Sequence, residues 1–268
     1  MTQFRKPAVA GLFYSAENKQ LVKDVQVLLA RAKHQTCLPK ALIVPHAGYV
    51  YSGSVAAAAY ATLNSIAGRI RRVVLLGPAH RFAFSGVALP DADAFTTPLG
   101  EIKLDVGWIR KNQHLSGLLV SRAAHEFEHA LEVQLPFLQC VLNDFVLLPL
   151  VVGMTTVETV AEILENAWGG EETLIVVSSD LSHYLPYEVA QQVDQQTIRG
   201  ILQLQLLADR DQACGSMPIN GLIMAARKHH LTPQLLDSCN SGDTAGERTQ
   251  VVGYASIAFT DIKVKHAS

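Results

Sequence analysis

Three runs of apolar residues in this chain each end directly before a short polar segment that contains histidine. The runs occupy residues 41–44, 73–76 and 174–177. Continuous runs of leucine and β-branched residues are typical of strands that are buried on both faces of a sheet. In an open α/β sheet, functional groups collect just beyond the carboxyl ends of such strands. The pattern therefore predicts that the three polar segments lie close together in space.

The three polar segments supply imidazoles and a carboxylate. His46 and His80 each follow a buried strand and a proline, while Asp180 and His183 follow the third strand. Together they predict a metal site or an acid–base site at one edge of the sheet. Two simpler interpretations stay open: His46 as a histidine of a surface loop, and Asp180 as the N-cap of a helix that its segment opens.

The rest of the chain alternates between helical and strand patterns. Helices are predicted where apolar spacing, caps or alanine content favour them: residues 17–33, 54–63, 129–142, 156–168, 187–208 and 218–230. Further strands are predicted at residues 145–152, 234–236 and 251–260, whereas residues 81–116 are less regular. Ser15 and Thr156 are candidate N-caps, and Pro136 predicts a kink or boundary.

This alternation predicts the fold class. We expect one α/β domain over residues 1–268, with a mixed or mostly parallel central sheet flanked by helices. The chain has 268 residues, of which 49% are hydrophobic and 17% charged, which favours a large buried core over disorder. No glycine-rich phosphate-binding motif supports nucleotide binding.

Charge and hydropathy limit the expected partners and location. Lys and Arg number 22 against 24 Asp and Glu, a net charge of −2, which favours neither nucleic acid nor an anionic membrane as a partner. The first residues lack the apolar core of a signal peptide. No run approaches the ~18 apolar residues that a membrane helix requires. A cytoplasmic location is therefore expected.

The chain has four cysteines, Cys37, Cys140, Cys214 and Cys239, none of them in a Cys-x-x-Cys pair. Free thiols are the expected state in a reducing compartment. Cys214 precedes the helix predicted from residue 218, and a thiol near a helix N-terminus has a lowered pKa, which makes the metal-binding thiolate accessible. A buried thiol in a loop is the alternative, and Cys239 is the competing candidate.

A further ionisable cluster contains the pattern His125-Glu126-x-x-His129. In zinc proteases, two histidines at this spacing bind the metal and the glutamate is the base. So short a motif also arises by chance, and a role for His129 beside the ligands or facing a substrate is the other interpretation. The remaining histidines are expected on the surface: His34, His114, His229, His230 and His266.

Taken together, these motifs resemble the Memo family, whose prokaryotic members are called AmmeMemoRadiSam system protein B. The matching segments follow one another along nearly the whole chain: residues 4–14, 44–53, 77–80, 128–138, 178–184, 214–219 and 241–255. The resemblance implies a fold like that of class III extradiol dioxygenases, in which two histidines and a carboxylate hold non-haem iron(II).

The resemblance also implies roles for individual residues. His46 and His80 would be metal ligands, and Cys214 would take the place of the carboxylate. Asp180 and His183 would line the same pocket, with His183 as the acid–base residue, and His129 would be a further pocket histidine in the catalytic set. The implied metal is iron or copper, with zinc less expected, because a thiolate makes the site softer and more easily oxidised.

Three functions follow as hypotheses. The first is a metal-binding, redox-capable protein, which would be an oxidoreductase if it turns over a substrate. The second is a zinc-dependent hydrolase, in which the metal activates water. The third is a non-catalytic module that binds a peptide or a partner. The expected ligands are a small molecule or a peptide, and a radical-SAM protein is the expected system partner.

Overall fold

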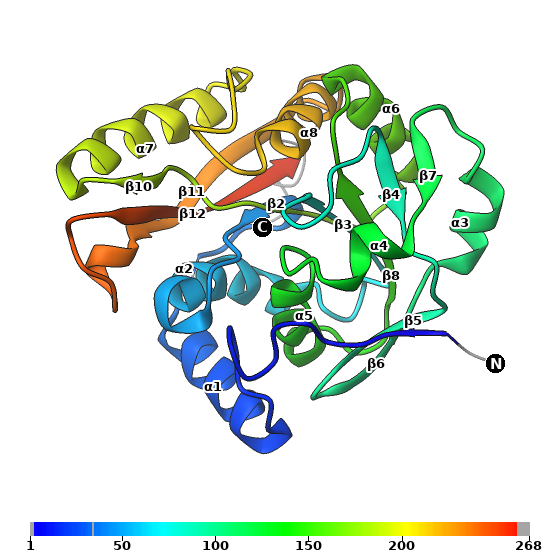
Figure 1. The fold of residues 1–268 in the computed structure, drawn as a ribbon, viewed down its shortest axis with the longest axis horizontal. Helices are drawn as coiled ribbons and strands as arrows, with labels where there is room; N and C mark the ends of the chain where they lie inside the picture. Colours follow the sequence, from blue (N-terminus) through cyan, green and yellow to red (C-terminus); the bar gives the residue numbers. More distant parts are fainter. Residues whose placement is uncertain (1–2, 34, 262–268) are drawn as a thin grey trace.

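A mixed sheet runs through the centre of the protein (Figure 1). The structure is a computed structural model that describes residues 3–33 and 35–261. Within these residues the sheet has nine strands. Their order is β10 (His183–Leu185), β12 (Val251–Asp261), β2 (Pro39–Val44), β9 (Thr173–Ser178), β3 (Arg72–Pro78), β8 (Val146–Val152), β4 (Val87–Leu89) and β7 (Leu118–Val120), and β11 (Leu231–Asn240) also pairs with β12.

The four neighbouring strands β2, β9, β3 and β8 are parallel to one another and contain the three predicted apolar runs. The residues of these runs are buried, as the sequence pattern predicts. Val44 of β2 pairs with Ser178 of β9, so the two strands end level with each other. The polar segments that follow β2, β9 and β3 therefore leave the same edge of the sheet, which confirms the predicted α/β class and the arrangement of the strand ends.

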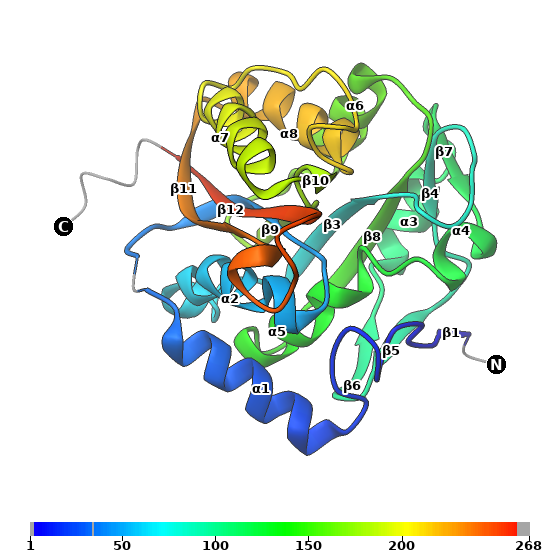
Figure 2. The same cartoon turned by 60° about the vertical axis from the view of Figure 1, so that its left-hand side comes forward.

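Helices cover both faces of the sheet (Figure 2). One face carries α1 (Asn18–Arg31), α2 (Tyr49–Ala61) and α5 (Leu135–Val141), and the other carries α6 (Val157–Ala167), α7 (Tyr187–Leu202) and α8 (Ser216–Lys228). Because both faces are covered, the central strands have no solvent-facing side. This explains why their sequences are continuously apolar instead of alternating.

Part of the less regular region and the N-terminal segment form a second, smaller sheet in the described chain, with the order β1 (Phe4–Arg5), β5 (Ala94–Thr97) and β6 (Gly100–Lys103). Short helical elements connect the remaining strands: η1 (Thr62–Ser65), α3 (Val106–Asn112), α4 (Arg122–Glu126), η2 (Glu132–Gln134) and η3 (Ser241–Asp243). The pairing of β1 with β5 holds the N-terminal segment beside residues 94–95. None of the helices in residues 3–33 and 35–261 combines the length and the apolarity needed to cross a membrane.

Several predicted boundaries move for identifiable reasons. The helix predicted to reach residue 208 ends at Leu202, and Leu204 adopts a left-handed φ of 57°. The segment 129–142 divides into η2 and α5, with Pro136 in the first turn of α5, so this proline marks a boundary, one of the two predicted outcomes. Thr156 caps α6 as predicted by accepting a hydrogen bond from Thr159 N–H.

One local prediction was wrong, and one predicted strand is longer than expected. Ser15 does not cap α1, because its hydroxyl accepts the N–H of Glu17 at 3.2 Å, and Glu17 itself occupies the N-cap position. The strand predicted at residues 234–236 extends over the whole of β11. Pairing with β12 along nearly its full length stabilises this strand, although its sequence contains a proline and several polar residues.

Replacing Gly221 with alanine is expected to lower the free energy of unfolding by about 1–3 kcal/mol through overpacking. Gly221 lies on α8, and a Cβ atom there would be 2.4 Å from Cγ1 of Val160 on α6. Gly200 on α7 is a matched control, because a Cβ there meets nothing within 4 Å. Its replacement by alanine is expected to stabilise the protein by roughly 0.5–1 kcal/mol. Denaturant unfolding would measure both, and equal effects would contradict the prediction.

Candidate metal centre

Three imidazoles meet at the carboxyl edge of the sheet. His46 follows β2, His80 follows β3 and His129 precedes η2. One ring nitrogen from each lies within 4.8 Å of the others, and the ring centroids are 4.7 to 5.4 Å apart. His46 is buried, whereas His80 is exposed, so the cluster has one side toward solvent. Three imidazoles in this arrangement are a ligand set that suits zinc, copper or iron.

His46 is fixed at both its backbone and its ring. Its backbone N–H donates to Oδ1 of Asp180 at 2.7 Å, and its ring nitrogen Nδ1 is 2.9 Å from Oγ of Ser178. Burial, together with the neighbouring His80, lowers the pKa of His46 to about 3. The ring is therefore neutral at physiological pH, which is the form that binds metals.

Glu128 holds His80 in place. The Glu128 carboxylate accepts the backbone N–H of His80 at 2.6 Å and its Nδ1–H at 2.9 Å. Burial raises the pKa of Glu128, but the hydrogen bonds from His80 outweigh this and hold it at about 2. A carboxylate that fixes a histidine in this way leaves Nε2 free for a metal. No role was predicted for Glu128, and its position directly before His129 was the available signal.

His129 lies between aromatic and polar neighbours. Its ring contacts Phe13, with centroids 5.0 Å apart, and stacks on His80. Its buried Nδ1 is 3.4 Å from Glu128 but has no hydrogen-bond partner among the described residues. Burial and His46 lower the pKa of His129 to about 4. A neutral imidazole with an unpartnered buried nitrogen, beside two other imidazoles, fits a metal-binding group.

Cys214 contacts the cluster through one member. Its sulfur is 3.3 Å from Nε2 of His46, and it lies outside the set of three histidine nitrogens. The predicted lowering of its pKa is wrong: burial and then the charge of Asp180 raise it to about 12. Moreover, α8 begins at Ser216, so Cys214 is not in the first turn of the helix. Without a metal, the thiol is therefore protonated at neutral pH.

Asp180 does not cap a helix, so that alternative was wrong. The residues after β9 lead into the strand β10 and not into a helix. Asp180 is buried, and its carboxylate accepts a hydrogen bond from the backbone N–H of His46. Burial raises its pKa. His183, at the start of β10, is half-buried. It lies close enough to His46 and Asp180 to contribute a lowering effect to the pKa of each. The structure thus brings His46, His80, Asp180 and His183 into one region, as the strand pattern predicts.

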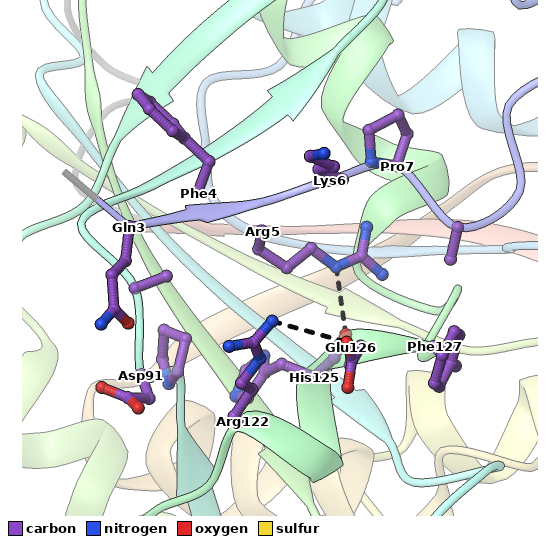
Figure 3. A pocket seen from close by; sticks show the side chains of 13 residues that line it. Gln3, Phe4, Arg5, Lys6, Pro7, Asp91, Arg122, His125, Glu126 and Phe127 are labelled. Carbon is purple, nitrogen blue, oxygen red and sulfur yellow. Dashed lines mark hydrogen bonds and ion pairs between the residues drawn. The ribbon is translucent and has the colours of Figure 1, made fainter. Parts of the chain in front are cut away.

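The zinc-protease pattern is not supported. α4 ends at Glu126, so His125 and His129 do not share a helix. His125 is buried, and its Nε2 is 2.9 Å from the carbonyl oxygen of Ala88. His125 and the N-terminal segment line a separate cavity of about 620 Å³. In this cavity, Nε of Arg5 donates a hydrogen bond to the backbone carbonyl of His125 (Figure 3).

The other predicted side chains lie away from the cluster. Among the surface histidines, His114 and His230 are exposed, while His229 is half-buried, stacks on Trp168 and pairs with Glu165 at 3.0 Å. His34 and His266 lie outside the described residues. The cysteines are all free thiols, as predicted.

A mixed α/β sheet with an imidazole cluster at the carboxyl ends of its parallel strands defines an α/β protein with a candidate metal centre. The family model described as "Memo-like protein" matches residues 5–258. The chain belongs to the Memo family.

Relatives and a solved structure agree with this assignment. Proteins named "MEMO1 family protein" are similar to this chain: one from Metallosphaera sedula is 33% identical over 96% of this chain and 99% of its own length, and one from Aquifex aeolicus is 35% identical over 95% and 98%. A crystal structure of an uncharacterized protein from Escherichia coli K12 covers 81% of this chain and 98% of its own, with a TM-score of 0.53 and 12% identity. At this identity the likeness concerns the fold alone, and the observed architecture is consistent with the predicted extradiol-dioxygenase-like fold.

Proposed function

We propose that this protein binds iron or copper at His46, His80 and a third ligand, and that it is a redox-capable protein of the oxidoreductase type. The observation that carries the proposal is the cluster of three imidazoles with donor atoms within 4.8 Å of one another. The carboxylate that fixes His80 and the unpartnered nitrogen of His129 support it. A bound iron or copper ion would supply one-electron and oxygen chemistry.

The surrounding side chains would serve distinct tasks. Asp180 would hold the backbone of His46 through the 2.7 Å hydrogen bond to its N–H. His183 would exchange a proton with a substrate, since it is half-buried near the cluster and is not engaged in holding His46 or His80. The exposed edge at His80 would admit the substrate.

Two residues compete to be the third ligand. Cys214 is favoured by the family resemblance and by its 3.3 Å contact with His46. His129 is favoured by the distances among the three imidazoles. A thiolate would favour copper(I), whereas three imidazoles are compatible with iron, copper or zinc. Binding through Cys214 requires that the metal displace the thiol proton.

The proposal is tested by elemental analysis of untagged protein purified without oxygen. We expect near-stoichiometric iron or copper in the wild type, loss of the metal in His46→Ala, and retention in His114→Ala, which replaces an exposed histidine. A metal-free wild type that also takes up no added iron or copper would overturn the proposal.

The third ligand is identified by a second pair of variants. If Cys214 binds the metal, Cys214→Ala loses the metal and the sulfur-to-metal charge-transfer absorption, while His129→Ala keeps that absorption. If His129 binds, the opposite pattern is expected: His129→Ala loses the metal, and Cys214→Ala keeps it.

A zinc-dependent hydrolase is a second candidate, because three imidazoles with an exposed side resemble the ligand set of hydrolytic zinc sites. In that case Asp180 or His183 would be the base. Stoichiometric zinc in the purified protein, with hydrolysis of ester or amide substrates, would favour it. Absence of both would exclude it.

The partners follow from the resemblance alone and stay proposals. We propose a small molecule or a peptide as the ligand of the site, and a radical-SAM protein as the system partner. Co-purification with that partner, and its loss in His80→Ala, would support a role of the metal centre in the interaction.

A further inference from the structure

A buried hydrogen-bond network extends from the ring of His46 into the core. Nδ1 of His46 is 2.9 Å from Oγ of Ser178, and Nε2 of Gln134 is 2.8 Å from the same oxygen. The hydroxyl of Tyr60 donates to Oε1 of Gln134 at 2.8 Å. Ser178, Gln134 and Tyr60 are completely buried. Three elements contribute to this network: the end of β9, η2 and α2.

Two backbone carbonyls fix the direction of each hydrogen bond. The carbonyl oxygen of Ala130 lies 2.6 Å from Oγ of Ser178 and can only accept, so the single hydroxyl proton of Ser178 points toward it. The carbonyl oxygen of Pro45 lies 2.9 Å from Nε2 of Gln134, which fixes the orientation of that amide. Both remaining positions on Oγ of Ser178 are therefore acceptors, one for Gln134 and one for His46.

We propose that Ser178 is a positioning residue that, held by Gln134, fixes the Nδ1–H tautomer of His46. The inference rests on the proposed metal-binding function and deepens it. With the proton on Nδ1, the lone pair is on Nε2, the nitrogen 3.3 Å from the sulfur of Cys214. His46 is thus set to bind a metal before any metal arrives.

The comparison with His80 supports this assignment. There the carboxylate of Glu128 accepts the Nδ1–H, so both histidines expose Nε2. The two acceptors differ in chemistry. The acceptor for His80 is the charged carboxylate of Glu128, whereas the acceptor for His46 is the neutral hydroxyl of Ser178, whose direction is set by a backbone carbonyl. A neutral acceptor avoids placing another negative charge beside the buried carboxylate of Asp180, whose Oδ2 is 3.9 Å from Nε2 of His46.

Replacement of Ser178 would remove the acceptor that fixes the tautomer of His46. In Ser178→Ala, the Nδ1 nitrogen loses its acceptor, and the tautomer with the proton on Nε2 becomes populated. That tautomer cannot donate a lone pair from Nε2, so metal affinity is expected to fall by roughly 10–100-fold, the range for removing a partner of a metal ligand.

The test is ¹H–¹⁵N NMR of histidine-labelled, metal-free protein, which distinguishes the two tautomers directly. The signals of His46 are identified by their absence in His46→Ala. We expect Nδ1–H in the wild type and a mixture or the Nε2–H form in Ser178→Ala. Ser256→Ala is a matched control, because Ser256 is also buried but its hydroxyl has no partner among the described residues.

Tyr60→Phe is the control within the network. It removes the outer hydrogen bond but leaves Pro45 to orient Gln134, so the tautomer and the metal affinity are expected to stay as in the wild type. An Nε2–H tautomer of His46 in the wild type would overturn the inference whatever the metal content, and apart from the assignment with His46→Ala this measurement depends on no variant. Conversely, an Nδ1–H tautomer in a protein that takes up no metal would overturn the proposed function while leaving the network intact.

Discussion

Replacing Glu132 with alanine is expected to lower the free energy of unfolding by about 3–5 kcal/mol, the typical cost of leaving a buried charge without its partner. The fully buried carboxylate forms an ion pair with Arg5. It also accepts hydrogen bonds from the N–H groups of Ala8 and Val9, at 2.7 and 2.9 Å, and from the hydroxyl of Tyr14 at 2.6 Å. The substitution leaves all four donors without their acceptor.

The same substitution is expected to disturb the metal centre. Arg5 also donates to the backbone carbonyls of His125 and Glu128, so it shapes the segment that carries Glu128 and His129. When Glu132 is lost, Arg5 keeps these two carbonyl acceptors but loses the carboxylate that fixes the other end of its guanidinium group. We therefore expect weaker metal binding in Glu132→Ala even at temperatures where the variant is folded.

Denaturant unfolding and a metal titration would measure the two effects. Glu126→Ala is the matched control, since Glu126 forms an exposed pair with Arg122 at 3.6 Å. Exposed pairs of this kind contribute at most about 0.5 kcal/mol. If Glu132→Ala were no more destabilising than Glu126→Ala, the buried pair of Glu132 and Arg5 would not stabilise the fold.

Replacing Glu128 with glutamine is expected to weaken metal binding by roughly 10–100-fold, because the partner of a metal ligand is lost. Glutamine has the same shape but cannot satisfy this site. One carboxylate oxygen accepts the N–H of His80, and the other accepts the N–H of Ala130 at 2.9 Å as well as Nδ1–H of His80. Either orientation of the amide therefore places its NH₂ against a backbone N–H, so stability should also fall.

A metal titration against a competing chelator would measure the loss. Glu165→Gln is the control, because Glu165 also contacts a histidine, His229, but far along the chain from the cluster and on α6. Wild-type affinity in Glu128→Gln would show that the orientation of His80 does not depend on the charge of Glu128.

The sequence was sufficient to predict the central strands and the residues at their ends. The runs at residues 41–44, 73–76 and 174–177 are continuously apolar because helices cover both faces, and this pattern is local enough to be seen in one sequence. Since parallel strands share a carboxyl edge, the proximity of His46, His80 and Asp180 followed from a general rule.

The residues that orient the ligands could not be predicted in the same way. Gln134 and Ser178 meet only because η2 packs against the end of β9, and nothing local to either residue indicates that contact. The predicted lowering of the pKa of Cys214 failed for a related reason. It was based on the nearby helix, whereas burial and then the charge of Asp180 determine the pKa and raise it. The alternative prediction, that Asp180 is the N-cap of a helix, failed because the residues after Asp180 form the strand β10 before α7 begins.

The position of β12 has a consequence for biosynthesis. This strand, made last among the described elements, pairs with β2 through Ile257 and Ile43, and with β10 through Val252 and His183. The strand that leads to His46 and the strand that begins at His183 thus depend on a partner that emerges from the ribosome after both. A nascent chain that lacks β12 has β2 paired on one side only, so the centre is expected to acquire its metal only after β12 has been made.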